Sequence, residues 1–323
     1  MATRRNALGL MGAGMGMAAL APRLARAAAA PRIPQRASVR VIADNDYAGD
    51  PDGLVALAHQ LLTPKARTVL VTSSALDPTL PMPGGAARSA ARGRDIAADL
   101  ARRLGVAPPP VVAGGEVLGA IAPGEAAHAI VAEAMRDDPL PLVFTCGGPL
   151  TNLAAALALE PRIASRMSLI WIGGGSYPAG SWEYNLNADI PAARVVIEQS
   201  AIAIRQVPQT TYRQMQFSVA ELYARLRPIS PFARWLYERF TSPPDFVDVA
   251  GAWPLGDTPT VLLGSVTAES STLETVAARR IRDDGTYGEE IAGRTIRVCT
   301  HIDARLAFED FLALLSMNAS HRS

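Results

Sequence analysis

Residues 39–54 read VRVIADNDYAGDPDGL, and they join an apolar run to a cluster of acids. The run Val39–Ala43 is typical of a buried strand, and the apolar residues 54–62 predict a helix. Pro51 suits the first turn of that helix, and Asp50 suits the cap before it. The acids between the two elements are therefore expected at the carboxyl end of a strand, where open α/β sheets place their ligands.

Four aspartates fall within nine residues of this turn, namely Asp44, Asp46, Asp50 and Asp52. Carboxylates so close together repel one another unless they are protonated or share a cation. Hard divalent ions take carboxylate and carbonyl oxygens, so calcium or magnesium is the natural partner. The alternative is a helix cap in a solvated turn, which is the commoner role of acidic turns in general. The position between a strand and a helix favours the cation.

The rest of the chain alternates predicted strands with predicted helices. The predicted strands are 67–72, 110–114, 140–145, 167–172, 201–207, 275–281 and 295–299. The predicted helices are 86–104, 126–135, 154–159, 190–199 and 304–315. This alternation, with short turns, predicts an α/β fold with a mostly parallel open sheet and helices on both faces. Prolines break residues 210–246, which predicts a helical excursion beside the sheet or over the site. Residues 176–189 are predicted to be a polar loop, and residues 316–323 a frayed tail.

Composition excludes several classes of function. The 323 residues are 49% hydrophobic with a formal net charge of +1. This is enough apolar material for one large domain or two smaller ones, and it gives no electrostatic case for nucleic acid. Lys65 is the only lysine among 31 basic residues, so a P-loop is excluded and Schiff-base chemistry is disfavoured. Cys146 and Cys299 could pair in an oxidising compartment, but their apolar flanks favour two buried thiols.

Residues 1–30 are expected to be a targeting segment. Arg4 and Arg5 precede an apolar run over residues 7–21, and small residues that suit cleavage continue to Ala30. This pattern resembles a twin-arginine signal, and the run is too short and too rich in glycine and alanine for a membrane span. We therefore expect export of the folded protein to the periplasm and a single catalytic domain over residues 31–323. No stable membrane insertion is expected after signal removal.

The acidic turn is the first of three motifs, each of which follows a predicted strand. The second is GPLTNLA at residues 148–154, and the third is EYNLNAD at residues 183–189. In this order the three resemble the nucleoside hydrolases, the inosine-uridine-preferring N-ribohydrolases, over roughly residues 38–315. The resemblance implies an enzyme that hydrolyses the N-glycosidic bond of a nucleoside or related riboside and releases the base and the free sugar.

The resemblance also implies a role for each site residue. A calcium ion is expected between Asp46, Asp52 and Asp257, with a main-chain carbonyl at Gly147. Asp50 is expected to be the base that takes a proton from the attacking water. The substrate side of the site is implied to consist of Asp44, which also braces the turn, Asn45, Glu183, Asn185 and Asn187.

Without the resemblance, Glu183 and Asn185 are better interpreted as polar residues that satisfy the backbone of their own loop. Likewise, Gly147 and Gly148 would be a plain turn into a helix, and Asp257 a turn residue before Thr-Pro.

The first motif departs from the family pattern in its spacing. Pro51 separates Asp50 from Asp52, where the family has adjacent acids. The roles of base and metal ligand could therefore be exchanged between these two aspartates.

A second departure concerns the leaving group. Studied members of the family have a histidine before the last aspartate, and Gly256 stands at this position. His59 lies on a predicted helix, where a core or surface role is more common than catalysis. Activation of the leaving group then falls to Trp182, Tyr184 or Tyr212, or the substrate has a leaving group that needs little help.

Three other classes of protein share parts of this pattern. An EF-hand loop fails at Ala48 and Val55, and the strand before the turn is wrong for it. A phosphatase of the haloacid-dehalogenase type would share the Asp44-x-Asp46 pattern, but it needs an essential lysine, and Lys65 lies too near the turn. A periplasmic nucleoside- or sugar-binding protein that kept the fold and lost turnover stays open because the histidine is missing. The sequence leaves the oligomeric state open, including a homo-oligomer.

Overall fold

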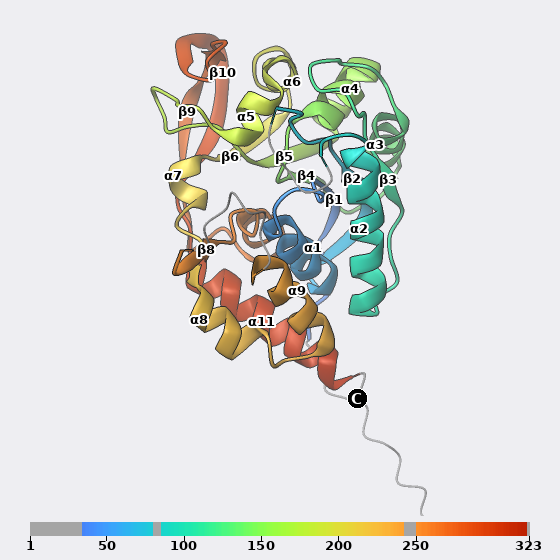
Figure 1. Ribbon diagram of the computed structural model, residues 1–323. Coiled ribbons are helices and arrows are strands. Elements are labelled where there is room, and N and C mark those ends of the chain that lie inside the picture. Colours follow the sequence, from blue (N-terminus) through green and yellow to red (C-terminus); the bar gives the residue numbers. More distant parts are fainter. Residues whose placement is uncertain (1–33, 80–84, 242–249, 322–323) are drawn as a thin grey trace, which may run out of the picture. The chain divides into compact units, whose positions relative to one another are not determined.

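The computed structural model describes residues 34–79, 85–241 and 250–321 (Figure 1). The predicted signal segment, residues 1–30, lies outside the described residues. The described residues all belong to one compact unit. None of the helices in the described part of the chain combines the length and the apolar character needed to cross a bilayer.

An eight-stranded sheet forms the centre of the fold, in the order β3-β2-β1-β4-β5-β6-β10-β9. All neighbouring strands are parallel except β9 and β10, which form an antiparallel hairpin at one edge. The mostly parallel open sheet predicted from the sequence is confirmed. The strands are β1 (Val39–Asn45), β2 (Ala66–Ser73), β3 (Val111–Ala113), β4 (Leu142–Cys146), β5 (Met167–Ile172), β6 (Ala203–Val207), β9 (Thr272–Ile281) and β10 (Tyr287–His301).

Helices cover both faces of the sheet, as predicted. One layer, below the strands in Figure 1, contains α1 (Asp52–Leu62), α2 (Ser89–Leu104), α9 (Pro231–Thr241) and α11 (Ala304–Ser320). The opposite layer contains α3 (Glu125–Met135), α4 (Thr151–Leu159), the single turn η1 (Pro161–Ser165), α6 (Ile190–Arg194) and the π-helical turn η2 (Val195–Gln199).

Strand β1 shows why the sequence pattern predicts a buried strand. Val41 and Ala43 pack in one core, whereas Ile42 packs in the other. A central parallel strand is buried on both faces, so apolar residues follow one another in it without alternation, as residues 41–43 do.

The predicted helical excursion is confirmed over its described part and continues beyond it. It contains a small two-stranded sheet that the sequence analysis did not predict, because strands of three residues carry almost no periodic signal. The elements are α7 (Gln209–Tyr212), β7 (Gln216–Ser218), α8 (Val219–Glu221), η3 (Leu222–Leu226), α9, β8 (Ala252–Pro254), α10 (Pro259–Val261) and η4 (Leu262–Val266).

Three local predictions were wrong. Asp50 does not cap α1, because the N-cap of this helix is Pro51 and no side chain caps it. The predicted loop 176–189 contains a short helix, α5 (Tyr184–Ala188), because the Glu183 side chain accepts the Leu186 N–H and caps it. The predicted frayed tail is helical as far as Ser320, since Asn318 Nδ2 donates to the Leu104 carbonyl at 3.0 Å and fastens the end of α11 to α2.

The two cysteines are buried and free. Cys146 ends β4 and Cys299 lies in β10, and β5 and β6 separate these strands. Three strand spacings amount to roughly 14 Å, well beyond the reach of a disulfide. The interpretation as buried thiols is confirmed.

Candidate active site

The acidic turn lies at the topological switch point of the sheet. Strand β1 has β2 on one side and β4 on the other, with Asp44 in register with Thr72 and Cys146. The segments that follow β1 and β4, which carry Asp46 and Gly147, therefore leave the sheet at the same edge. Open α/β sheets bind ligands at such a point.

Asp257 joins this edge from a distant part of the chain. Its backbone N–H donates to Asp52 Oδ2 at 3.2 Å, and its Oδ2 accepts a hydrogen bond from Asn45 Nδ2 at 2.8 Å. A Cβ on Gly147 would lie 2.6 Å from Asp257 Cγ, so only glycine allows the β4 turn this close to the carboxylate. The structure thus brings together Asp52, Asp257 and the Gly147 backbone.

The five aspartates differ in their exposure. Asp44 and Asp257 are buried, Asp46 and Asp52 are half-buried, and Asp50 is exposed. Burial is the main reason that the pKa values of Asp46 and Asp52 lie well above the usual aspartate range, and repulsion from Asp257 adds to it. Burial and the charge of Asp50 raise the pKa of Asp257 to about 8. This arrangement favours a positive charge among the carboxylates.

No ion pair joins any of these five aspartates to a cationic side chain of the described residues. Within those same residues, no three acidic, histidine or cysteine side chains form a ready-made metal centre. The donor types nevertheless fit a hard divalent cation, because they are all carboxylate or carbonyl oxygens. The calcium site with Asp46, Asp52 and Asp257 therefore stays a prediction.

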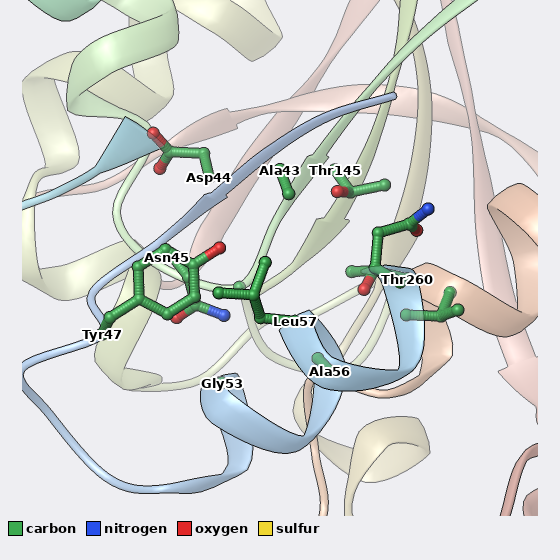
Figure 2. Close-up of a pocket in the computed structure, with 12 residues that line it drawn as sticks. Ala43, Asp44, Asn45, Tyr47, Gly53, Ala56, Leu57, Thr145 and Thr260 are labelled. Atoms are coloured by element: carbon green, nitrogen blue, oxygen red, sulfur yellow. The ribbon is translucent and has the colours of Figure 1, made fainter. Parts of the chain in front are cut away.

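Asn45 links the acidic turn to Asp257. Besides its bond to Asp257, its Oδ1 accepts the Asp46 N–H at 2.8 Å, and a Cβ on Gly53 would lie 2.9 Å from its side chain. Figure 2 shows the Asn45 side chain on the side of the first turn of α1, where Gly53 lies. The amide predicted to contact substrate is thus also a structural bridge between two carboxylate-bearing segments.

Asp44 is held at the base of the site. Its Oδ2 accepts hydrogen bonds from Thr72 Oγ1 at 2.5 Å and from Asn152 Nδ2 at 2.7 Å. Burial outweighs these bonds and raises the pKa of Asp44 to about 6. Sequence reasoning missed Thr72 and Asn152 as partners, although Asn152 stands within the second motif. A cavity of about 10 Å³, room for roughly one water molecule, lies beside Asp44, Asn45 and Gly147 (Figure 2).

Glu183 faces the site from the loop after β5. It is 1% exposed, and its Oε2 accepts the backbone N–H groups of Gly174 at 2.6 Å and Leu186 at 3.0 Å. Its Oε1 accepts a hydrogen bond from the Tyr212 hydroxyl at 3.1 Å. Burial raises the pKa of Glu183 above its ordinary value.

The two predicted asparagines of this loop make backbone contacts. Asn185 Nδ2 donates to the carbonyls of Gly147 at 3.1 Å and Ile172 at 2.9 Å. Asn187 Oδ1 accepts the Glu183 N–H at 3.0 Å. Both asparagines therefore satisfy the backbone around the site, and Asn185 connects the loop after β5 to the turn after β4.

The three candidates for leaving-group activation lie in different surroundings. Trp182 is 59% exposed, and the Tyr184 hydroxyl accepts the Asp77 N–H at 3.2 Å. Tyr212 is half-buried between Glu183 and Gly256, where a Cβ on the glycine would lie 3.0 Å from the tyrosine ring. His59 has the core role expected of it: it is buried, its Nε2 lies 2.8 Å from Asp310 Oδ2, and it contacts Phe311.

An open α/β sheet with an aspartate-rich site at its topological switch point defines the class of this protein. The chain belongs to the inosine-uridine preferring nucleoside hydrolase family, whose family model matches residues 41–309. The family resemblance of the three motifs is thereby confirmed.

Individual relatives are distant. A pyrimidine-specific ribonucleoside hydrolase RihA of Shewanella sp. (strain ANA-3) is 28% identical over 205 residues, which are 57% of this chain and 63% of that protein. A RihA of Salmonella newport is 33% identical over 79 residues, 23% of this chain and 25% of that protein. The chain spans less than two thirds of the length of these curated relatives.

Solved structures share the fold over most of the chain. An inosine-uridine preferring nucleoside hydrolase from Bacillus anthracis has a TM-score of 0.63 and 19% identity, covering 86% of this chain and 99% of that one. A purine-preferring ribonucleoside hydrolase from Gardnerella vaginalis has a TM-score of 0.63 and 17% identity, covering 87% and 99%. These similarities show the α/β fold over most of the chain, whereas the motifs cover only short segments of it.

Proposed function

We propose that this protein hydrolyses the N-glycosidic bond of nucleosides and releases the base and the free sugar. The observation that carries the proposal is the group of aspartates at the switch point, with the buried Glu183 beside it. Family membership supports the reaction class, and the relatives named as ribonucleoside hydrolases support a nucleoside substrate. The activity, the substrate and the cation are all parts of this proposal.

The proposed reaction has two parts, the attack by water and the departure of the base. A water molecule attacks the anomeric carbon of the sugar, the bond from that carbon to the base nitrogen breaks, and the nitrogen takes up a proton as the base leaves. Such cleavage passes through an oxocarbenium-like state. Asp50 is the base in this proposal, because it is the exposed carboxylate of the acidic turn and can accept the proton that the attacking water loses.

A calcium ion is part of the proposal. Asp46, Asp52, Asp257 and the Gly147 carbonyl would hold it, since they supply only oxygen donors and no cationic side chain of the described residues neutralises the acids. When bound, the ion lowers the pKa of the attacking water and anchors sugar hydroxyls. Glu183, from the opposite side, offers a buried carboxylate for a further sugar hydroxyl.

A non-catalytic nucleoside- or sugar-binding protein is the second candidate. Gly256 favours it, because glycine supplies no acid for the departing base. The phosphatase and EF-hand alternatives lose support in the fold. Lys65 precedes β2 and lies at the amino end of the sheet, the edge opposite the aspartates, and the acidic turn follows a strand.

Export is a separate proposal. Arg4 and Arg5 before the apolar run support passage through the twin-arginine route and a periplasmic location. Free nucleosides outside the cytoplasm would then be the substrates available to the protein.

The test is release of reducing sugar from a panel of purine and pyrimidine ribonucleosides, with calcium present. We expect turnover of at least one nucleoside and its loss in Asp50→Asn. Saturable binding of nucleosides measured by calorimetry, with no sugar released from any of them, would favour the binding protein instead. Phosphate release from nucleotides without cleavage of the glycosidic bond would contradict both candidates.

A further inference from the structure

Tyr212 lies between the two halves of the site. Its hydroxyl donates to Glu183 Oε1, and its ring edge meets Gly256. A Cβ on Gly256 would lie 3.0 Å from Tyr212 Cδ2 and 3.2 Å from Asp52 Oδ2. The ring therefore uses the space left by the absent side chain at position 256, next to Asp257.

The short helix α7 that carries this tyrosine is anchored to the site. The Gln209 N–H donates to the Gly174 carbonyl at 2.9 Å, and Thr211 Oγ1 donates to the Cys299 carbonyl at 2.6 Å. Gly174 also donates its own N–H to Glu183. A single residue thus fixes both the tyrosine-bearing helix and the carboxylate that the tyrosine contacts.

Gly174 must be glycine to do this. Its φ of +79° lies in the left-handed region, and a Cβ there would lie 2.2 Å from the Tyr287 hydroxyl. The spatial relation between α7 and Glu183 is therefore set by the backbone as well as by side chains.

Tyr212 supplies a side-chain donor to Glu183, whereas the other donors are backbone N–H groups. Gly174 and Leu186 donate to Oε2, and the Asn185 backbone also donates to the carboxylate. Tyr212 donates to Oε1. A sugar hydroxyl that binds Oε1 must therefore approach beside the tyrosine.

We propose that Tyr212 is a positioning residue of the hydrolysis proposed above, on which this inference rests. Its hydroxyl orients Oε1 of Glu183 toward one hydroxyl of the bound sugar. Its ring fills the space over Gly256 and closes the site between Glu183 and Asp52. The discrimination between a sugar that carries this hydroxyl and one that lacks it then depends on Tyr212.

The first experiment compares Tyr212→Phe with wild type on the best riboside and on its 2′-, 3′- and 5′-deoxy analogues. Tyr223→Phe is the matched control, because Tyr223 is 55% exposed and its ring contacts Tyr237 and Arg227, outside the site. We expect Tyr212→Phe to raise KM for the riboside about tenfold with a smaller change in kcat, since it loosens a hydrogen bond to a charged group. For one of the three analogues, Tyr212→Phe and wild type should have the same KM.

A double-mutant cycle with Glu183→Gln tests whether the effect passes through Glu183. Tyr212→Phe should add less than about twofold in the Glu183→Gln background, because contacting residues are non-additive. Gly256→Ala is an independent variant, because its methyl group displaces the Tyr212 ring or Asp52. If the hydrogen bond from Tyr212 to Glu183 is lost as a result, kcat/KM for the riboside should fall about tenfold or more. Melting temperatures of all variants separate these effects from misfolding.

The outcomes are distinct. This inference alone is overturned if wild type hydrolyses a nucleoside and Tyr212→Phe has the same KM and the same pattern across the analogues as Tyr223→Phe. A loss in Tyr212→Phe that is equal for the riboside and all three analogues, with a lowered melting temperature, also overturns it, since it shows a purely structural role. Wild-type protein that releases no sugar from any nucleoside overturns the proposed function, and this inference falls with it.

Discussion

At the scale of single residues, Asp50 and Asp52 share a motif but have different surroundings. Asp50 is exposed, whereas Asp52 is half-buried and its Oδ2 accepts the Asp257 N–H. Asp52 is thereby hydrogen-bonded to Asp257, which reaches the site from a distant part of the chain. These surroundings favour Asp50 as the base and Asp52 as a ligand, despite the extra Pro51 between them.

For Asp50→Asn we expect a fall in kcat of roughly 10²–10⁴-fold, because the amide cannot accept a proton. Its melting temperature should stay close to that of wild type, since Asp50 is exposed. Steady-state kinetics at saturating calcium and thermal melts measure both quantities.

Asp52→Asn is expected to act through the cation. The calcium concentration for half-maximal activity should rise, and added calcium should restore much of the turnover. A calcium titration of activity for both variants checks this. Near-normal turnover in Asp50→Asn, together with an Asp52→Asn variant that calcium cannot rescue, would require the two roles to be exchanged.

At the scale of elements, acidic caps order the loop that carries the third motif. Glu183 caps α5, and Asp189 caps α6 by accepting the Ala192 N–H at 3.0 Å. Asp189 also accepts a hydrogen bond from Thr151 Oγ1 of α4 at 2.5 Å. The second and third motifs are therefore joined by a buried bond, and the cap holds the end of the Glu183 loop in place.

Asp189→Ala should lower the free energy of unfolding by about 1–3 kcal/mol, because it removes a helix cap and leaves the buried Thr151 hydroxyl unpaired. Asp189→Asn is the matched control, since asparagine is an equally good cap and keeps an acceptor oxygen. Urea denaturation of the three proteins measures the difference. Equal midpoints for Asp189→Ala and wild type would contradict the role of this cap.

At the scale of the whole molecule, a shared cation would join segments that are far apart in the chain. Asp52 and Asp257 are 205 positions apart, and they come from α1 and from the segment before α10. An ion between them would bind the folded chain and not the unfolded one, so it would stabilise the domain as well as the site.

Removal of calcium with a chelator should abolish activity and lower the melting temperature. An ion present at 100 times its Kd contributes about 2.7 kcal/mol to the free energy of unfolding. Thermal melts with chelator, with calcium restored and with magnesium in its place measure the effect and its selectivity. Full activity and an unchanged melting temperature in chelator would contradict the cation proposal.

Export can be tested on the full chain. The double variant Arg4→Lys, Arg5→Lys should fail to reach the periplasm, because the twin-arginine route reads both arginines. Arg23→Lys is the control, since it keeps the pair intact. Immunoblots of cell fractions measure the distribution, and periplasmic protein from the double variant at the wild-type level would sink the proposal.

The sequence by itself determined the α/β class, the strand-end position of the acids and the family. These features are local: hydrophobic periodicity distinguishes strands from helices, and the three motifs occupy short runs of consecutive residues. Segments of three to five residues, such as α5 and β7, escaped prediction because too few residues carry a periodic signal.

Only the tertiary structure decided which side chains meet at the site. The bond from Asn45 to Asp257, the bond from Tyr212 to Glu183 and the Tyr212 ring over Gly256 each join residues that no local pattern relates. The physical reason is that these contacts depend on how distant elements pack around the edge of the sheet. From the sequence, Gly256 therefore indicates only that a side chain is missing. In the folded protein, the Tyr212 ring fills the space that this side chain would occupy.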